Sequence, residues 1–418
     1  MLRGYRYRIY PTEEQQVLLA KHFGCVRFVY NWALDTKQRA WKEEQKNVSL
    51  FDLHSLLKNE LKKENDWLKE VTAQSLQYAI RQMDAAYKNF FKKKAKFPKF
   101  KKKSSVQTCN FPQDNKADFR HGILEIRNFR GENAIRCRFH RRFSGELKRV
   151  TIIRECDGRY YATCLVEDRF TPLQKKKVFR ETTIGVDTGL THFATLSTGE
   201  KIASPKILKN DSLRLARLQR SLSRKKKGSS NYAKAKLHIA RLHSKVAHRR
   251  SDFLHKLTYR LTHENQVSCI CVEDLNVKGM MKNHHLAYSI ADAGLGEFYR
   301  QLAYKCEWYG VTYRVIDRFA PSSKLCNNCG HRMNKMPLSV RKWTCPECGT
   351  NHDRDINAAQ NIKELGLMAL PVQRGEVKPV EKPPVDDRAT KHLRSDAPVK
   401  QEKSVRTISQ AAQSSAEW

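Results

Sequence analysis

The chain has 418 residues, enough for two or three domains, and its 80 Lys and Arg residues against 43 Asp and Glu residues give a net charge of +37. The mean hydropathy is −0.69 and no apolar run reaches the roughly 18–20 residues of a membrane span. The N-terminus shows no secretory signal. We therefore expect a cytoplasmic protein with a polyanionic partner, for which nucleic acid is favoured over a membrane surface.

The first hundred residues predict one strand followed by helices. Residues 5–9 alternate bulky and basic side chains, as in a strand, and Thr12 with Gln15 forms a capping-box pattern at the start of a helix. Helical patterns continue to about residue 91.

The helix predicted over residues 74–91 has two distinct faces. Its apolar stripe consists of Leu76, Ile80, Met83 and Tyr87. Gln77 and Arg81 lie one turn apart on another face and are candidates for contacts with DNA, since Gln can pair with adenine and Arg with guanine or phosphate. An ordinary solvated helix face is an equally good interpretation.

Residues 91–103 interleave lysines with three phenylalanines, and Pro98 ends the preceding helix. Lys99 and Lys101 are candidate phosphate contacts there, with stacking on the rings; the alternative is a solvated charge run. Residues 106–170 hold short β-rich runs separated by turn residues. Together with the N-terminal strand they predict a small β-barrel into which the helices are inserted.

The second half of the chain predicts an α/β domain. One strand ends at Asp187 and forms a hairpin with the next, and another buried strand ends at Glu273. Between them, residues 212–262 predict two basic helices, whose connection carries the candidate phosphate contacts Arg224, Lys225, Lys226 and Lys227. After residue 370 the chain is rich in proline and charge without periodicity, which predicts a disordered basic tail.

Four of the twelve cysteines are paired along the chain. Cys326, Cys329, Cys345 and Cys348 follow the pattern C-x2-C, fifteen residues, C-x2-C, and Gly330 and Gly349 follow each pair. This spacing is typical of a structural zinc ribbon, in which four thiolates leave no open position on Zn²⁺. The other eight are scattered among apolar neighbours and are expected to be buried.

Three acidic residues stand at the ends of predicted elements. Asp187 and Glu273 each end an apolar strand, and Asp355 opens a predicted helix. Converging carboxylates suit hard cations such as Mg²⁺ or Mn²⁺, and two such ions can cut a phosphodiester. Taken singly, each acid could be a surface residue or a helix cap. Their joint occurrence in so basic a chain favours a metal-dependent nuclease.

These segments resemble the TnpB family, which is encoded in insertion sequences and related to type V CRISPR effector nucleases. The resemblance is carried by IGVDTGL with Asp187, CVEDLNV with Glu273, the two cysteine pairs and HDRDINAAQNI with Asp355. Segments such as YPTEEQ, FPKFKKK and SDFLHKLT extend it over about residues 1–369. The order of the motifs along the chain makes the match specific.

The resemblance implies a multidomain α+β protein with an RNase H/RuvC-like nuclease domain and a zinc-ribbon insert. Asp187, Glu273 and Asp355 would be catalytic, with Asp353 a cap or an outer group. The implied domains are a wedge-like barrel (1–12 and 106–178), a helical recognition domain (13–105), the nuclease domain (179–325 and 351–369), the ribbon (326–350) and the tail (370–418).

The activity implied by the resemblance is RNA-guided cleavage of double-stranded DNA beside a short DNA motif, by a monomeric, nucleoid-associated ribonucleoprotein with a transposon-end-derived guide RNA. The net charge of the chain is consistent with a guide RNA. It provides contacts to phosphates, which carry no sequence information, and the chain has no obvious reader of a long DNA site, so a bound RNA would select the target. The alternatives are a DNA-binding repressor without cleavage, an accessory or strand-transferring transposition protein, and a zinc-ribbon RNA-binding protein.

Overall fold

The structure is a computed structural model that describes residues 1–264, 266–337 and 339–368. The predicted tail at 370–418 therefore lies outside the described residues. The described chain divides into two compact units, Met1–Arg169 and the residues from Phe170 onward. Within this described part, none of the helices combines the length and apolarity of a membrane span.

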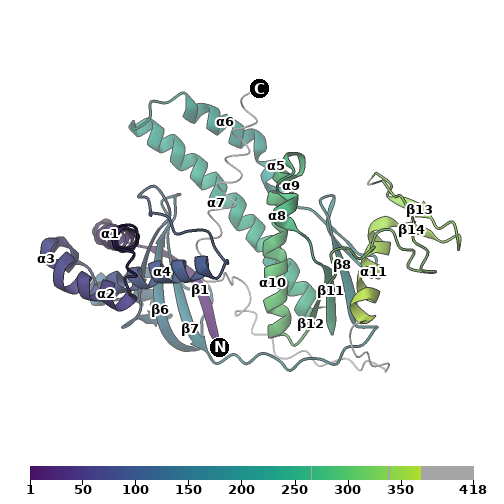
Figure 1. Cartoon of the computed structure of the whole chain (residues 1–418), viewed down its shortest axis with the longest axis horizontal. Coiled ribbons are helices and arrows are strands. Elements are labelled where there is room, and N and C mark those ends of the chain that lie inside the picture. Colours follow the sequence, from purple (N-terminus) through teal and green to yellow (C-terminus); the bar gives the residue numbers. More distant parts are fainter. Residues whose placement is uncertain (265, 338, 369–418) are drawn as a thin grey trace. The chain divides into compact units, whose positions relative to one another are not determined.

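The first unit is an antiparallel sheet covered by helices that are inserted after its first strand (Figure 1). Its helices are α1 (Glu13–Glu44), α2 (Leu50–Leu56), α3 (Lys62–Glu64) and α4 (Ala73–Phe91). Its strands are β1 (Leu2–Tyr10), β2 (Gln107–Phe111), β3 (Lys116–Asp118), β4 (Ile123–Glu125), β5 (Ile135–Arg138), β6 (Gly145–Arg154) and β7 (Tyr160–Asp168).

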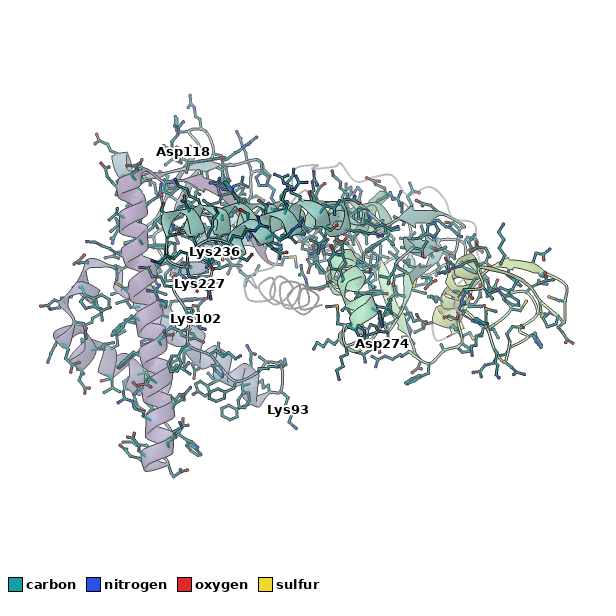
Figure 2. The ribbon with its side chains drawn as sticks, turned by 90° about the horizontal axis from the view of Figure 1, so that it is seen from above. Lys93, Lys102, Asp118, Lys227, Lys236 and Asp274 are labelled. Atoms are coloured by element: carbon teal, nitrogen blue, oxygen red, sulfur yellow. The ribbon has the colours of Figure 1, made fainter. Side chains whose placement is uncertain are left out.

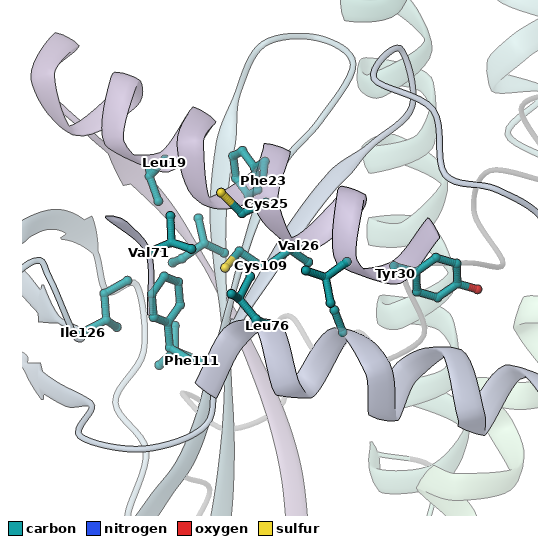
Figure 3. Packing of buried hydrophobic residues seen from close by; sticks show 14 of the residues in the cluster. Leu19, Phe23, Cys25, Val26, Tyr30, Val71, Leu76, Cys109, Phe111 and Ile126 are labelled. Atoms are coloured by element: carbon teal, nitrogen blue, oxygen red, sulfur yellow. The ribbon is translucent and has the colours of Figure 1, made fainter. Parts of the chain in front are cut away.

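The helix signals in this unit are confirmed. Thr12 and Gln15 form the capping box at the start of α1, with Thr12 N donating to Gln15 Oε1 at 3.0 Å. The apolar stripe of α4 is buried, and it joins residues of α1 and of the sheet in one core cluster (Figure 3). The inserted helices and the sheet are thus parts of a single packed unit.

The predicted small barrel is not confirmed. The seven strands are ordered β2-β6-β7-β1-β5-β4-β3, which leaves an open sheet with β2 and β3 at its two edges. A barrel fills its interior with side chains from its own strands. Here α1 and α4 supply side chains to the core instead, so the sheet buries its apolar face without closing.

The second unit is built on a five-stranded sheet ordered β10-β9-β8-β11-β12. Its strands are β8 (Thr183–Thr188), β9 (His192–Leu196), β10 (Lys201–Ala203), β11 (Cys269–Glu273) and β12 (Thr312–Ile316), followed by the hairpin β13 (Lys342–Thr344) and β14 (Asn351–Asp353). Its helices are α5 (Ile207–Asn210), α6 (Ser212–Ser223), α7 (Ser230–Tyr259), α8 (Val277–Met280), α9 (His284–Ala293), α10 (Leu295–Trp308) and α11 (Arg354–Met368).

Helices cover both faces of this sheet (Figure 1). On one face, the ring of Phe193 from β9 lies 5.1 Å from Phe253 of α7 and 5.2 Å from Phe298 of α10. On the other face, α11 packs on β8 and β11. The predicted Asp187 hairpin and the pair of basic helices, α6 and α7, are confirmed.

Candidate active site and cysteine cluster

Two of the three acidic residues stand side by side at one edge of the five-stranded sheet. Strands β8 and β11 are parallel, with Val186 opposite Val272. Asp187 and Glu273 are the next residues on each strand, so both follow the last paired position at the same edge. The expected convergence of these two strand ends is therefore present in the structure.

Two glycines let α11 approach the sheet closely. A Cβ atom on Gly185 of β8 would lie 2.0 Å from the carbonyl oxygen of Ala359, and one on Gly366 of α11 would lie 2.3 Å from Cys271 Sγ. Gly185 and Cys271 thus face α11 directly. Because side chains alternate along a strand, Asp187 and Glu273, two residues further on, point to the same face. Asp355 stands one helical turn before Ala359, at the start of α11.

Burial and mutual repulsion shape the electrostatics of this edge. Burial, followed by the charges of Glu273 and then Asp355, raises the pKa of Asp187 to about 7. Burial also raises the pKa of Glu273, and the hydrogen bond from Ser322 Oγ to Glu273 Oε1, at 3.0 Å, opposes this rise. The charges of both Glu273 and Asp355 thus act on Asp187, and a divalent cation would stabilise such a set of oxygen donors.

Asp353 and Asp355 have different surroundings. Asp353 caps α11, because its Oδ1 accepts the backbone N–H groups of Asp355 and Ile356, both at 3.2 Å, and its Oδ2 lies 2.6 Å from Lys201 Nζ. Burial would raise the pKa of Asp353, but these partners outweigh burial and lower it. Asp355 is approached only loosely, by Arg341 at 3.4 Å and His192 at 3.9 Å.

Two buried asparagines of α11 hold the segment that leads into the cysteine cluster, and sequence reasoning missed them. Asn357 donates to the carbonyl of Leu325 at 2.7 Å and accepts the N–H of Asn327 at 3.0 Å. Asn361 donates to the carbonyls of Leu325 and Ser322, at 2.6 and 2.7 Å. The sequence did contain a signal for this role: two asparagines spaced four residues apart lie on one face of the helix, next to alanines that indicate close packing.

The cysteine cluster has the dimensions of a tetrahedral metal site. The four sulfur atoms lie within 4.8 Å of one another, the one such group of His, Cys, Asp and Glu donors among the described residues. Cys326 and Cys348 sulfurs are 3.7 Å apart, and those of Cys329 and Cys345 are 3.6 Å apart. A Zn–S bond of about 2.3 Å in a tetrahedron separates sulfurs by about 3.8 Å.

Both turns of the cluster have the same backbone geometry. Gly330 and Gly349 have φ angles of +79° and +69°, and their N–H groups donate to the carbonyls of Cys326 and Cys345. Glycine adopts this left-handed conformation without strain. Hydrogen bonds from Thr350 lower the pKa of the Cys348 thiol to about 5, which favours the thiolate that binds metal.

The candidate nucleic-acid contacts differ in their exposure. Lys225 is half-buried, and six of the candidates are exposed: Gln77, Arg81, Lys99, Arg224, Lys226 and Lys227. Lys227 lies at the turn between α6 and α7, and Lys236 lies further along α7 (Figure 2). Lys101 instead places its ammonium group 4.0 Å from the ring centroid of Tyr30, and burial lowers its pKa to about 8. Its role as a phosphate contact stays a prediction.

Comparison with known proteins extends this description. Three family profiles match the chain: "Probable transposase" (OrfB_IS605) over residues 163–284, "Cas12f1-like, TNB domain" over 296–362, and "Helix-turn-helix domain" (HTH_OrfB_IS605) over 1–46. Over residues 1–46, which the helix-turn-helix profile matches, the structure has strand β1 and one continuous helix, α1. A solved Cas12f1–sgRNA–target DNA complex has a similar fold, with a TM-score of 0.52, 14% identity and coverage of 84% of this chain and 83% of that chain.

The fold is therefore mixed α+β and multidomain, similar to that of this Cas12f1 chain. A protein from Streptomyces pristinaespiralis named "Putative RNA-guided DNA endonuclease" is 43% identical over 88% of this chain and 90% of its own length. "Putative RNA-guided DNA endonuclease InsQ" of Escherichia coli is 32% identical over 88% of this chain and 93% of its own length. The chain belongs to the TnpB (OrfB) family of IS605-type elements.

Proposed function

We propose that this protein is an RNA-guided DNA endonuclease that hydrolyses phosphodiester bonds at Asp187, Glu273 and Asp355. The observation that carries the proposal is that Asp187 and Glu273 end two neighbouring parallel strands, and the charge of Asp355, at the start of α11, acts on Asp187. The names of the relatives and the net charge of +37 support a nucleic-acid substrate. DNA-bound repression without cleavage is the alternative, and the presence of all three acids gives it no support.

The three carboxylates would hold Mg²⁺ or Mn²⁺. When bound, two such ions supply an activated water and stabilise the leaving oxygen of the phosphodiester. The chain itself fixes the donor oxygens: Ser322 orients the Glu273 carboxylate, and the close packing of α11 on Gly185 sets the position of Asp355. Asp353, which is bound by Lys201 and two backbone N–H groups, is assigned a structural role.

We assign the cysteine cluster to one structural Zn²⁺ per chain. Elemental analysis of protein purified without chelator is expected to give one zinc atom per molecule. Cys326→Ser or Cys345→Ser should lose that zinc and reduce cleavage indirectly, because the ribbon is held to α11 by Asn357 and Asn361. Seven of the eight other cysteines are buried as expected, but the prediction is wrong for Cys156, which is exposed. Cys156→Ser, outside the cluster, is therefore the control and should keep both zinc and activity. Wild-type protein without zinc would contradict the assignment.

The guide would supply the recognition of a long target sequence, for which the chain shows no obvious reader. We propose that a transposon-end-derived RNA pairs with the target, and that the α6–α7 turn and the segment around Lys99 bind the phosphates of the RNA and of the heteroduplex. Gln77 and Arg81 are the candidate readers of a short DNA motif beside the target. The proposed working form is a monomeric ribonucleoprotein in the cytoplasm, at the nucleoid.

Removing and changing the guide tests the function. The protein is co-expressed with its flanking element-end RNA, purified, and given double-stranded DNA with Mg²⁺. We expect cleavage at sites set by the 3′ end of the RNA, movement of the cut when that end is changed, and no cleavage in EDTA. RNase-treated protein should bind DNA weakly and cut little. Equal, site-specific cutting by RNase-treated protein would leave an ordinary metal-dependent nuclease, and guided binding without cutting would favour the repressor.

A further inference from the structure

The loop that follows β12 presents an exposed aromatic side chain next to the candidate active site. Phe319 is 85% exposed, the highest value among the large apolar side chains of the described residues. It stands three residues after Ile316, the last residue of β12. Single exposed apolar side chains are common, so the inference depends on where this ring stands and on how its backbone is held.

On both sides of Phe319 the loop is fixed to the end of β11 or to the residue that follows it. On one side, Arg318 Nη2 lies 2.6 Å from Asp274 Oδ2, and its Nε donates to the Asp274 carbonyl at 3.0 Å. On the other side, Ser322 donates to Glu273 at 3.0 Å. Glu273 and Asp274 are consecutive residues, so the loop that carries Phe319 is tied directly to a proposed catalytic carboxylate and to its neighbour.

The turn itself is also ordered by hydrogen bonds. The backbone N–H of Phe319 donates to Asp317 Oδ1 at 2.8 Å, and the N–H of Ala320 donates to the Asp317 carbonyl at 3.2 Å. These bonds fix the backbone at Phe319 while leaving its ring free of the protein surface. A ring on a fixed backbone can stack on a ligand at a low cost in conformational entropy.

Phe319 borders a surface hollow of about 500 Å³, whose lining includes Val315, 44% exposed, and Arg318 with Asp274 and Asp317. The hollow is shallow and open to solvent, so it can cover one face of a flat ligand but cannot enclose one. The carboxylates of Asp274 and Asp317 share the lining with one guanidinium, that of Arg318, which is already paired with Asp274. This hollow therefore does not attract a phosphate, unlike most of this basic chain. It suits the flat, uncharged part of a nucleotide, the nucleobase.

We propose that Phe319 stacks on a nucleobase of the DNA strand being cut, next to the phosphate held at Asp187, Glu273 and Asp355, and that the hollow receives that base. This inference rests on the proposed function and deepens it, because it identifies a residue that positions the substrate strand. Stacking on an aromatic ring accepts every base, so the contact fixes the register of the strand without restricting its sequence.

The test measures single-turnover cleavage by the full ribonucleoprotein with Mg²⁺. Phe319→Ala is expected to lower the cleavage rate at subsaturating enzyme by roughly 10- to 100-fold, the scale of losing one base–aromatic stack. Phe319→Trp, which keeps an aromatic face, should retain most of the rate. Phe51→Ala removes a ring that is 81% exposed elsewhere in the chain and should change the rate by less than about twofold.

A scan with abasic sites identifies the stacked base and needs no protein variant. Single abasic nucleotides are placed at each position near the cut, in each DNA strand in turn. One position should slow the wild-type enzyme by a factor similar to that of Phe319→Ala and should have no further effect in that variant, since the two partners of one contact are not additive.

The outcomes separate the inference from the function on which it rests. Cleavage by Phe319→Ala equal to wild type, or an abasic scan without a sensitive position, would overturn the stacking role and favour a protein partner in the hollow. Additive effects of the variant and the abasic site would also overturn it. Failure of the wild-type ribonucleoprotein to cut guided DNA would overturn the proposed function itself.

Discussion

Replacing Asp187, Glu273 or Asp355 by alanine is expected to lower DNA cleavage by at least roughly 10³-fold while leaving binding of guide RNA and target DNA largely intact. Each carboxylate supplies oxygen donors to the same proposed cations, so losing one disrupts the whole arrangement. Residues that act as a unit show non-additive losses, and the double variant Asp187→Ala/Glu273→Ala should therefore be hardly slower than either single variant. Cleavage rates and gel-shift affinities of the ribonucleoproteins measure the two effects separately.

Asp353→Ala is the matched control, because Asp353 lies only two residues from Asp355 but is bound by Lys201 and by the first N–H groups of α11. Its loss removes a helix cap, worth about 1 kcal/mol, and should slow cleavage only mildly. An inactive Asp353→Ala together with an active Asp355→Ala would show that the third acid has been assigned incorrectly.

Gly185→Ala is expected to be a strongly disruptive single-methyl change in the second unit. The added Cβ would lie 2.0 Å from the backbone oxygen of Ala359 and 2.7 Å from the backbone nitrogen of Lys363, so α11 has to move as a whole. We expect destabilisation of about 3 kcal/mol, at the upper end of overpacking effects. This corresponds to a fall in Tm of roughly 6–12 °C, accompanied by loss of cleavage because Asp355 moves with α11.

Gly296→Ala is the control for this change. Gly296 lies in α10 of the same unit, and a Cβ atom there would have no neighbour within 4 Å. Alanine favours a helix by about 0.5–1 kcal/mol over glycine, so this variant should be as stable as wild type or slightly more so. A stable, active Gly185→Ala would contradict the role assigned to the close packing of α11.

Local signals in the sequence predicted much of the fold. The capping box at Thr12 and the buried stripe of α4 depend on residues within one or two turns, and the periodicity of the chain records them directly. The cysteine spacing predicted a compact cluster because both turns are short and contain a glycine. The convergence of Asp187 and Glu273 followed from their places at strand ends, once those strands proved to be parallel neighbours.

Features that depend on distant partners could not be predicted in this way. Closure of the first sheet depends on whether β2 and β3 meet, and the packing of α1 and α4 decided against it. The exposure of Lys101 depended on Tyr30, and the function of Asn361 depended on carbonyl groups at Ser322 and Leu325. The type and spacing of a residue do not predict which backbone groups from distant parts of the chain will lie beside it after folding.

Because α11 comes late in the chain, the proposed active site can be assembled only near the end of protein synthesis. The chain leaves the ribosome from its N-terminus at roughly 5–20 residues per second, so Asp355 emerges on the order of ten seconds after Asp187. Throughout this interval the β8 face around Gly185 has no helix on it, and the third carboxylate does not yet exist. Any product that terminates early, before Asp355, lacks that carboxylate altogether. The order of the motifs thus makes the proposed active centre one of the last parts of the described chain to be completed, and unfinished copies of the chain are expected to lack nuclease activity.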